Sequence, residues 1–240
     1  MNAIASNPLA AGPGTSQERA YRHIKDGIIS YRLKPGERLA AATLAADLSV
    51  SRTPVREALS RLEQERLVVR ESGWGYVVRA MSFADIAHTY RVREALEVEA
   101  AREALPHLDS SALAFLAELL LRAEGFLSTG SISEFLRVSR QFHNTIAEHT
   151  GNWVLQDMLR MITDRIQIVG ALVMERHPEC GVDILRENRR ILAAFDEGDL
   201  SKVEQHVRGH VHRARERVSM FFNEDSRDLY VGGGYSHPAS

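Results

Sequence analysis

The residues best suited to chemistry lie at the start of a short amphipathic segment, "VSRTPVREALSRLEQERLV". Val55, Leu59 and Leu62 recur there at helical spacing, which predicts a helix from about residue 51 or 53 to residue 65. Polar side chains then gather at its solvent-facing N-terminal end: Ser51, Arg52, Thr53 and Arg56. Arginine can bind guanine bidentately, and hydroxyls and free helix amides suit phosphate oxygens. The pattern is typical of a recognition helix that enters the DNA major groove.

The alternative is an exposed helix whose arginines are solvated or paired with Glu57 and Glu63. The neighbouring segments favour DNA binding instead. Residues 17–30 predict a helix, Pro35-Gly36 predicts a turn, and "AATLAADLSV" predicts a short helix. Two β-prone runs, "LVVR" and "YVVRA", flank "ESGWG", whose glycines permit a hairpin. Three helices and a two-stranded wing make a winged helix-turn-helix.

From residue 82 onward the pattern is helical throughout, without a strand signal. Breaks at proline or glycine separate six predicted segments: 82–105, 109–128, 131–150, 152–176, 180–197 and 199–222. Ser82, Ser131 and Asp199 are the expected caps of three of them. The fold class is therefore mostly α, with an N-terminal winged helix-turn-helix followed by an all-α bundle of six antiparallel helices.

Polar residues interrupt the apolar stripes of five of these helices. They are Arg93, Ser139 with His143 one turn later, Arg165, Asn188 and His210. Each one alone reads most simply as a core residue with satisfied hydrogen bonds. Because buried polar groups need partners, their coincidence on several core-facing stripes predicts a shared polar cavity.

Composition limits the class of protein. The chain has 240 residues, of which 44% are hydrophobic and 26% charged, as in ordinary globular proteins. Residues 1–80 hold 12 Lys and Arg against 8 Asp and Glu, and the remainder holds 18 against 24, so only the first part suits a polyanion. No apolar run is long enough to span a bilayer, and the first residues do not have the pattern of a secretory signal. A single cysteine, Cys180, excludes an internal disulfide and a Cys-rich zinc site, so we expect a cytoplasmic protein.

The segments "LKPGERL", "LAADLSVSRTPVREALSRLEQERLV" and "GWGYVV" closely resemble the GntR family of bacterial transcription regulators, in the same order. The resemblance covers about residues 16–80. It implies that Arg52, Thr53 and Arg56 contact the operator, with help from Gly73 at the wing tip. Arg38 and Ser51 complete the predicted DNA-contacting set. Members bind short palindromes as dimers, so the resemblance implies a homodimer on palindromic double-stranded DNA.

The second part resembles the C-terminal FCD domain of the FadR subfamily over about residues 82–222. "YRVREALEVEAA", "SRQFHNTIAEHTGN" and "RENRRILAAFDEGDLSKVEQHVRGH" carry this similarity. The resemblance implies a divalent metal held by one Asp and three His, with an organic acid completing the coordination. Here Ser139 aligns with the Asp and Asn188 with one His, so only His143 and His210 remain as strong ligands. Ser and Asn are weak donors for zinc or nickel.

We therefore expect a metal-free pocket rather than a zinc or nickel site on His143 and His210. Its polar groups would hydrogen-bond a small organic acid through Ser139, His143, Asn188 and His210, with Arg93 and Arg165 pairing its carboxylate. The predicted function is a DNA-binding transcription regulator under effector control. One alternative is a regulator with a vestigial pocket. Another is an enzyme using His143 and His210, although no carboxylate pair or activated nucleophile is visible beside them.

The predicted domain organisation has four parts: a flexible tail over 1–15, the winged helix-turn-helix over 16–80, the effector-binding and dimerisation domain over 81–224, and a flexible tail over 225–240.

Overall fold

The computed structural model of the chain describes residues 14–73 and 75–224, without the side chains of 222–224. The described chain divides into two compact units, one ending at Ala80 and the other beginning at Met81. The tail expected over 225–240 lies outside the described residues, as does 1–13 of the first tail. Thr15, placed in that tail, instead caps the first helix, because its side chain accepts a hydrogen bond from the Glu18 amide.

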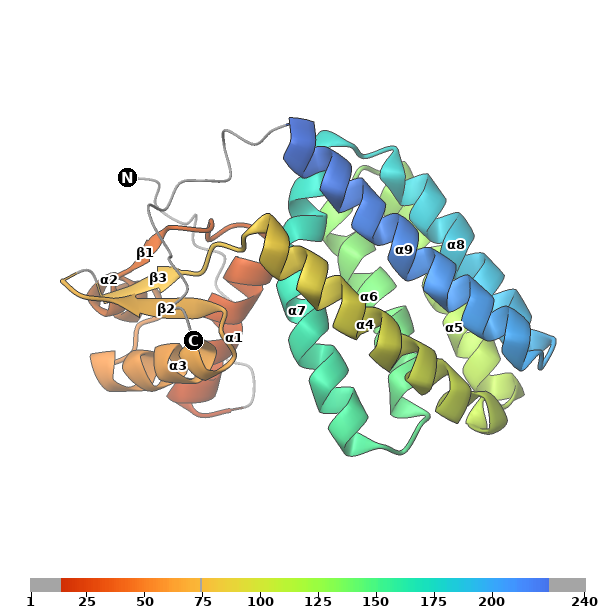
Figure 1. The fold of residues 1–240 in the computed structure, drawn as a ribbon. Coiled ribbons are helices and arrows are strands. Elements are labelled where there is room, and N and C mark those ends of the chain that lie inside the picture. The colour runs from red at the N-terminus through yellow and green to blue at the C-terminus, as the bar shows by residue number, and fades with distance from the viewer. Residues whose placement is uncertain (1–13, 74, 225–240) are drawn as a thin grey trace, which may run out of the picture. The chain divides into compact units, whose positions relative to one another are not determined.

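The N-terminal unit holds three helices and a small antiparallel sheet (Figure 1). In chain order the elements are α1 (Ser16–Ile29), β1 (Arg38–Leu39), α2 (Ala41–Asp47), α3 (Arg52–Gln64), β2 (Val68–Glu71) and β3 (Gly75–Val78). The sheet order is β1-β3-β2, with Val69 opposite Val77. The predicted two-stranded wing is confirmed as the β2–β3 hairpin, and β1 is a third strand that the sequence did not predict. Two residues are too few to give an alternating pattern, and only the pairing of Arg38 with Val77 reveals the strand.

Two turns fix the shape of this unit. At the end of α2, Ser49 has a φ of 53°, and the amide of Val50 donates to the Ala45 carbonyl. This closure stops α2 and starts the connection to α3. At the wing tip, Gly73 and Gly75 have φ of 77° and 80°, a region that favours glycine. The glycines of "ESGWG" thus form the predicted hairpin.

Arg61 has a structural role within this unit. Its guanidinium carbon lies 3.6 Å from the centre of the Tyr21 ring, and its Nη1 lies 3.0 Å from a Glu18 carboxylate oxygen. Both partners belong to α1, while Arg61 belongs to α3. The residue therefore joins the two helices, whereas Arg52 and Arg56 are exposed.

The second unit is all helical in its described residues. Its elements are α4 (Phe83–Ala104), the 3₁₀ turn η1 (Leu105–His107), α5 (Ser110–Ser128), α6 (Ile132–Glu148), α7 (Trp153–Arg176), α8 (Cys180–Asp196) and α9 (Leu200–Glu224). All six predicted helices are confirmed, with ends at most two residues from the predicted ones. Helix α9 packs against α4 and α8, and α6 packs against α5 and α7.

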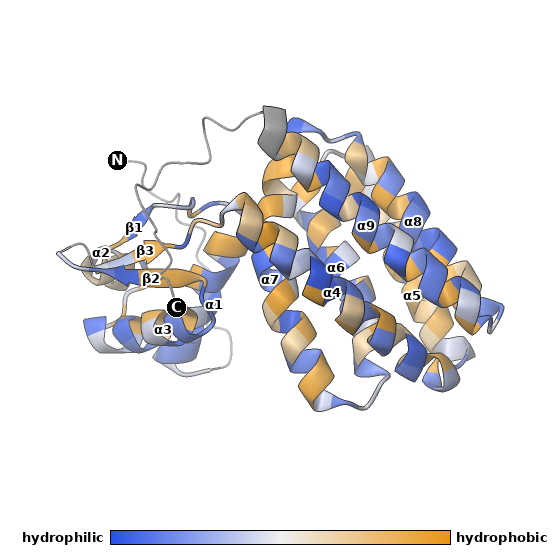
Figure 2. Cartoon of the chain, viewed as in Figure 1, coloured by the Kyte–Doolittle hydropathy of each residue, from blue (hydrophilic) through white to orange (hydrophobic). Residues whose placement is uncertain are grey.

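Apolar side chains fill the centre of this bundle. Phe135, Phe142, Leu116 and Ile191 are fully buried members of one cluster shared by α5, α6 and α8. Figure 2 shows hydrophobic and hydrophilic residues alternating around these helices, as amphipathic packing requires. The mostly α fold class is confirmed.

Two of the three predicted N-cap residues form capping hydrogen bonds. Ser82 forms a reciprocal capping box with Asp85, and Asp199 accepts from the Lys202 amide. Ser131 precedes α6 as expected but makes no capping hydrogen bond with its side chain. Its hydroxyl lies 3.1 Å from that of Thr129 instead. Within the described residues, no helix is long and apolar enough to cross a membrane.

We predict that Arg61→Ala lowers the stability of the N-terminal unit by roughly 1 kcal/mol, since it removes a cation–π contact and an ion pair. Hydrogen exchange of the α1 and α3 amides measures this effect. Arg56→Ala, on the same helix, is the matched control and should leave exchange unchanged. Equal exchange in both variants would contradict the structural role of Arg61.

Candidate functional site

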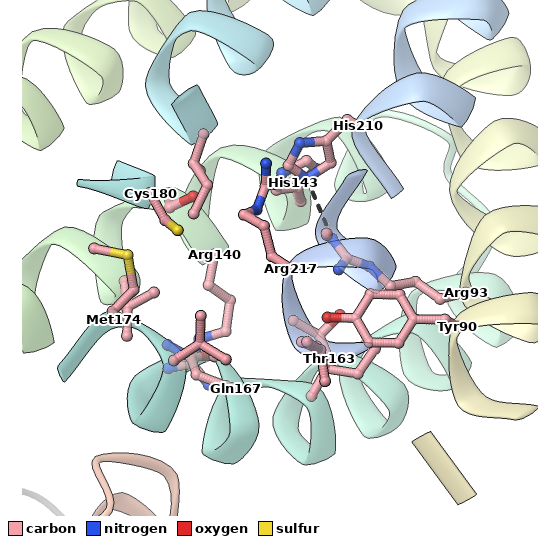
Figure 3. Close-up of a pocket in the computed structure, with 18 residues that line it drawn as sticks. Tyr90, Arg93, Arg140, His143, Thr163, Gln167, Met174, Cys180, His210 and Arg217 are labelled. Carbon is pink, nitrogen blue, oxygen red and sulfur yellow. Dashed lines mark hydrogen bonds between the residues drawn. The ribbon is translucent and has the colours of Figure 1, made fainter. Parts of the chain in front are cut away.

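A cavity of about 110 Å³ lies in the helical unit among α4, α6, α7, α8 and α9 (Figure 3). Much of its wall is aliphatic, supplied by Leu136, Ile166, Val173, Met174, Ile184 and Val218. Its polar lining comes from Tyr90, Arg93, Ser139, Arg140, His143, Thr163, Gln167, His210 and Arg217. An apolar wall with a few convergent polar groups is typical of a small-molecule site.

Glu187 of α8 is the most heavily bonded acid beside this cavity. Its carboxylate accepts from His210 Nδ1 at 2.8 Å, from Arg213 Nε at 2.6 Å, and from both Nη atoms of Arg217 at 2.9 and 3.0 Å. All three donors belong to α9. The contact with Glu187 puts the proton of His210 on Nδ1, which leaves Nε2 of that ring as an acceptor.

A second buried acid, Glu97 of α4, meets Arg93 one turn earlier on the same helix. Arg93 Nε lies 2.5 Å from Glu97 Oε1, and its Nη2 lies 3.5 Å from His210 Nε2, the contact dashed in Figure 3. His143 Nδ1 lies 3.4 Å from Glu97 Oε2, and the rings of His143 and His210 stack with centroids 4.9 Å apart. Arg93, Glu97 and the two histidines thus form one buried group.

Burial and charge set the protonation of this group. Burial lowers the pKa of His143 to about 3, against the opposing effect of Glu97. Burial also lowers the pKa of His210, although its hydrogen bond to Glu187 opposes this. Burial would raise the pKa of Glu97, but Arg93 and the two histidines outweigh it and lower that pKa to about 2. Near neutral pH the site therefore holds neutral imidazoles and an ionised Glu97.

Four of the six residues predicted for effector binding line the cavity: Arg93, Ser139, His143 and His210. Asn188 lies outside the lining and is buried beside it, where its Nδ2 donates to Ser139 Oγ at 3.3 Å. Arg165 is half-buried on α7 and is not part of the lining. The stripe containing Ile162 and Val169 suggested an inward side chain for Arg165, whereas Thr163, Ile166 and Gln167 form the α7 wall.

Sequence reasoning missed several residues of the site. It found no carboxylate pair beside the histidines, whereas in the structure Glu97 contacts His143 and Glu187 contacts His210. The signals were present: Glu97 follows Arg93 by four positions, so the two share a helix face. Arg217 lies seven positions after His210, again on one face, and Tyr90 carries a hydroxyl on a stripe counted as apolar.

The other candidate site is the N-terminal end of α3. Ser51, Arg52, Thr53 and Arg56 are all exposed, while Val55, Leu59 and Leu62 are fully buried. Ser51 is the N-cap residue but makes no capping hydrogen bond with its side chain. Among the described residues, neither Arg52 nor Arg56 has a side-chain ion pair or hydrogen bond, so the alternative pairing with Glu57 and Glu63 is not found.

The sheet adds two more predicted DNA contacts to the same unit. Gly73 is exposed at the tip of the β2–β3 hairpin, and Arg38 is exposed on β1. The space around the Cα of Gly73 is open, because a Cβ at this position would meet no atom within 4 Å. The unit thus presents an exposed helix end with two arginines and an open glycine at a hairpin tip.

Two family models match this chain. The model described as bacterial regulatory proteins, gntR family, matches residues 16–78, and the FCD domain model matches residues 88–213. The chain is 27% identical over 205 residues to YdhC of Bacillus subtilis, an uncharacterised HTH-type transcriptional regulator, covering 85% of this chain and 91% of that one. It is 34% identical over 141 residues to the Nta operon transcriptional regulator of Aminobacter aminovorans, covering 58% of this chain and 66% of that one.

Solved structures show the same fold. E. coli McbR/YncC aligns over 88% of this chain and 100% of its own, with a TM-score of 0.81 and 23% identity. A putative GntR regulator from Rhodococcus sp. RHA1 aligns over 85% of this chain and 97% of its own, with a TM-score of 0.74 and 24% identity.

The neutral state of His143 predicts a pH dependence. The folded-state pKa, about 3, is below the ordinary value of 6.5, so the unfolded chain binds a proton first as the pH falls. Stability should therefore fall from about pH 6.5 downward, by about 1–2 kcal/mol at pH 5 from this residue. Urea unfolding at pH 7 and pH 5 measures the difference, which should shrink in His143→Asn. The exposed His107→Asn is the control, and the same pH dependence in all three proteins would contradict a buried neutral imidazole.

Proposed function

The chain belongs to the GntR family of bacterial regulatory proteins and carries an FCD domain, so it is a DNA-binding transcription regulator, and we propose that a small carboxylic acid in its helical unit controls its affinity for a palindromic operator. The family and the relatives identify a regulator and not an enzyme. The observation that carries operator binding is the exposed, unpaired pair Arg52 and Arg56 at the start of α3. Unpaired guanidiniums at a helix N-terminus suit guanine edges and phosphates.

Effector control is supported by the cavity. FCD domains bind small-molecule effectors, and this one has guanidinium groups of Arg93, Arg140 and Arg217 around an aliphatic wall. A carboxylate is the group that a guanidinium binds best, because both can pair through two parallel hydrogen bonds. The vestigial-pocket alternative predicts a filled centre, whereas this centre is open to a ligand.

Arg217 connects effector binding in the cavity with the packing of α9. Arg217 lines the cavity and also holds Glu187, which fastens α9 to α8. An acid that draws Arg217 toward itself weakens that contact and favours another packing of α9. A ligand acts in this way by binding one arrangement more tightly than the other, which shifts their populations. We propose that the effector lowers the affinity for the operator, so that the protein is released and transcription is derepressed.

Dimerisation is expected, since GntR regulators typically bind DNA as dimers. Helix α7 supports a surface for it: Trp153, Val154, Met158 and Met161 are exposed on its first three turns, with Trp153 72% exposed. Figure 2 shows hydrophobic residues along this helix. A contiguous exposed apolar stripe is typical of an interaction surface, and a two-fold dimer can use one stripe on both copies.

We predict that Arg52→Ala and Arg56→Ala each abolish specific operator binding without changing the fold. A bidentate arginine contact contributes about 1–3 kcal/mol of discrimination, and its phosphate contacts add affinity. Fluorescence anisotropy at fixed salt measures this, with an operator selected from a random duplex library by the wild-type protein. Arg186→Ala is the control, since Arg186 pairs with Asp183 on the surface of α8. Wild-type affinity in both α3 variants would refute the recognition helix.

We predict that Met158→Glu converts the dimer to monomers, because each copy would place a charge in the apolar contact. Sedimentation velocity measures the oligomeric state, and operator affinity should fall with it, since two half-sites are no longer held together. Leu121→Glu is the matched control, because Leu121 is 65% exposed on α5, away from this stripe. If Met158→Glu remains a dimer, the proposal that α7 forms the interface is wrong.

A further inference from the structure

The similarity to FCD domains implies a divalent metal, and the residues of this cavity can be tested for it. Two of the aligned positions hold Ser139 and Asn188, which are neutral. They bond to each other, Asn188 Nδ2 donating to Ser139 Oγ at 3.3 Å. Neither supplies the charge that offsets a divalent cation.

The structure nevertheless contains a set of strong donors from another combination of helices. Single ligand atoms of Glu97, His143 and His210 all lie within 4.8 Å of one another. Glu97 Oε2 and His143 Nε2 are buried and form no hydrogen bond among the described residues, although His143 Nδ1 lies 3.4 Å from Glu97 Oε2. His210 Nε2 is an acceptor, because Nδ1 of the ring faces Glu187. One carboxylate and two neutral imidazoles place lone pairs and one negative charge close together, an arrangement that favours a bound cation.

The chain already supplies that cation. The Arg93 guanidinium contacts two members of the set, Glu97 Oε1 at 2.5 Å and His210 Nε2 at 3.5 Å. It is itself buried, with 7% of the residue exposed, so solvent screens its charge on these neighbours less than at the surface. Figure 3 shows it directed from α4 toward His210.

Charge balance then argues against a metal in addition. Arg93 offsets Glu97, and Glu187 is already bonded to Arg213 and Arg217. A divalent ion placed here would add two buried positive charges, while the charge of the only carboxylate in the set, Glu97, is already offset by Arg93, which is strongly unfavourable. The residues present do not fit the metal that the family implies.

We infer that the Arg93 guanidinium takes the place of a metal cation beside Glu97 and His210, so that this regulator binds the carboxylate of a small apolar acid without a divalent metal. This deepens the effector role proposed above and rests on it for the identity of the ligand as an effector. A metal favours acids that chelate through several oxygens. A guanidinium offers a flat pair of donors that matches a single carboxylate.

The remaining wall of the cavity limits the rest of the ligand. Most of the surface that it turns toward the cavity is apolar, with Leu136, Ile166, Val173 and Ile184 among its residues, so it suits a mainly hydrocarbon body better than a polyhydroxylated one. The volume, about 110 Å³, is smaller than the ~150 Å³ of an apolar cavity that holds benzene. A short branched acid matches both features.

The first experiment measures bound metal. Wild-type protein, Arg93→Met and Arg140→Met are incubated with zinc or nickel, dialysed and analysed by elemental mass spectrometry. We expect substoichiometric metal in the wild type and stoichiometric zinc in Arg93→Met, because Glu97, His143 and His210 lose their internal cation. Arg140→Met is the matched control, since Arg140 lines the same cavity but pairs with Asp164, and it should remain metal-poor.

Stoichiometric metal in the wild type overturns the inference directly, and so does equal metal content in all three proteins. The wild-type measurement needs no variant to fold. Circular dichroism checks the variants, and Arg93→Gln replaces Arg93→Met if the latter is unfolded. Neither readout involves DNA. If no acid changes the affinity for the operator, the effector role is refuted and the assignment of Arg93 is not affected.

The second experiment tests the acid. Isothermal titration in the presence of a chelator compares isobutyrate and isovalerate with malate and citrate. We expect the two apolar acids to bind the wild type and Arg186→Ala, and at least a tenfold loss of affinity in Arg93→Met. Binding that requires added zinc, a preference for malate or citrate, or no binding by either apolar acid would overturn the assignment.

Discussion

Glu187 accepts hydrogen bonds from His210, Arg213 and Arg217 while only 4% of its side chain is exposed. An ionised carboxylate cannot be buried without such partners, and supplying them requires three side chains from one helix to meet a residue of another. The contact therefore fixes how α9 lies on α8. It also fixes the tautomer of His210: Nδ1 carries the proton, so Nε2 presents its lone pair on the cavity side.

The second buried pair, Arg93 and Glu97, follows from the same constraint and gives the cavity its character. Because the guanidinium is held among acceptors and beside an aliphatic wall, the site combines a fixed positive charge with a dry surface. Low-dielectric surroundings strengthen such a charge toward an incoming anion. The N-terminal unit uses arginine in the opposite setting, since Arg52 and Arg56 are exposed and carry no partner among the described residues.

Helix positions could be predicted because burial imposes a period of 3.6 residues, and breaks at proline and glycine mark the ends. All six helices of the second unit follow this rule. Strand β1 could not be predicted, because two residues carry no period and pairing with β3 defines them. Within the cavity, Arg93, Ser139, His143 and His210 were predictable as polar interruptions of apolar stripes. Glu97 and Arg217 were missed, although each shares a helix face with a predicted residue.

The sequence by itself determined the family, the mostly α fold and the end of α3 at which Arg52 and Arg56 lie, since motif order and periodicity are local properties of the chain. Of the four metal-ligand positions that the family resemblance implies, the sequence also placed weak donors, Ser139 and Asn188, at two. Only the tertiary structure decided which charges meet. Arg93 could have faced a ligand, a metal or solvent. Its contact with Glu97 lies within α4, whereas its contact with His210, 117 positions later, exists because α4 packs against α9.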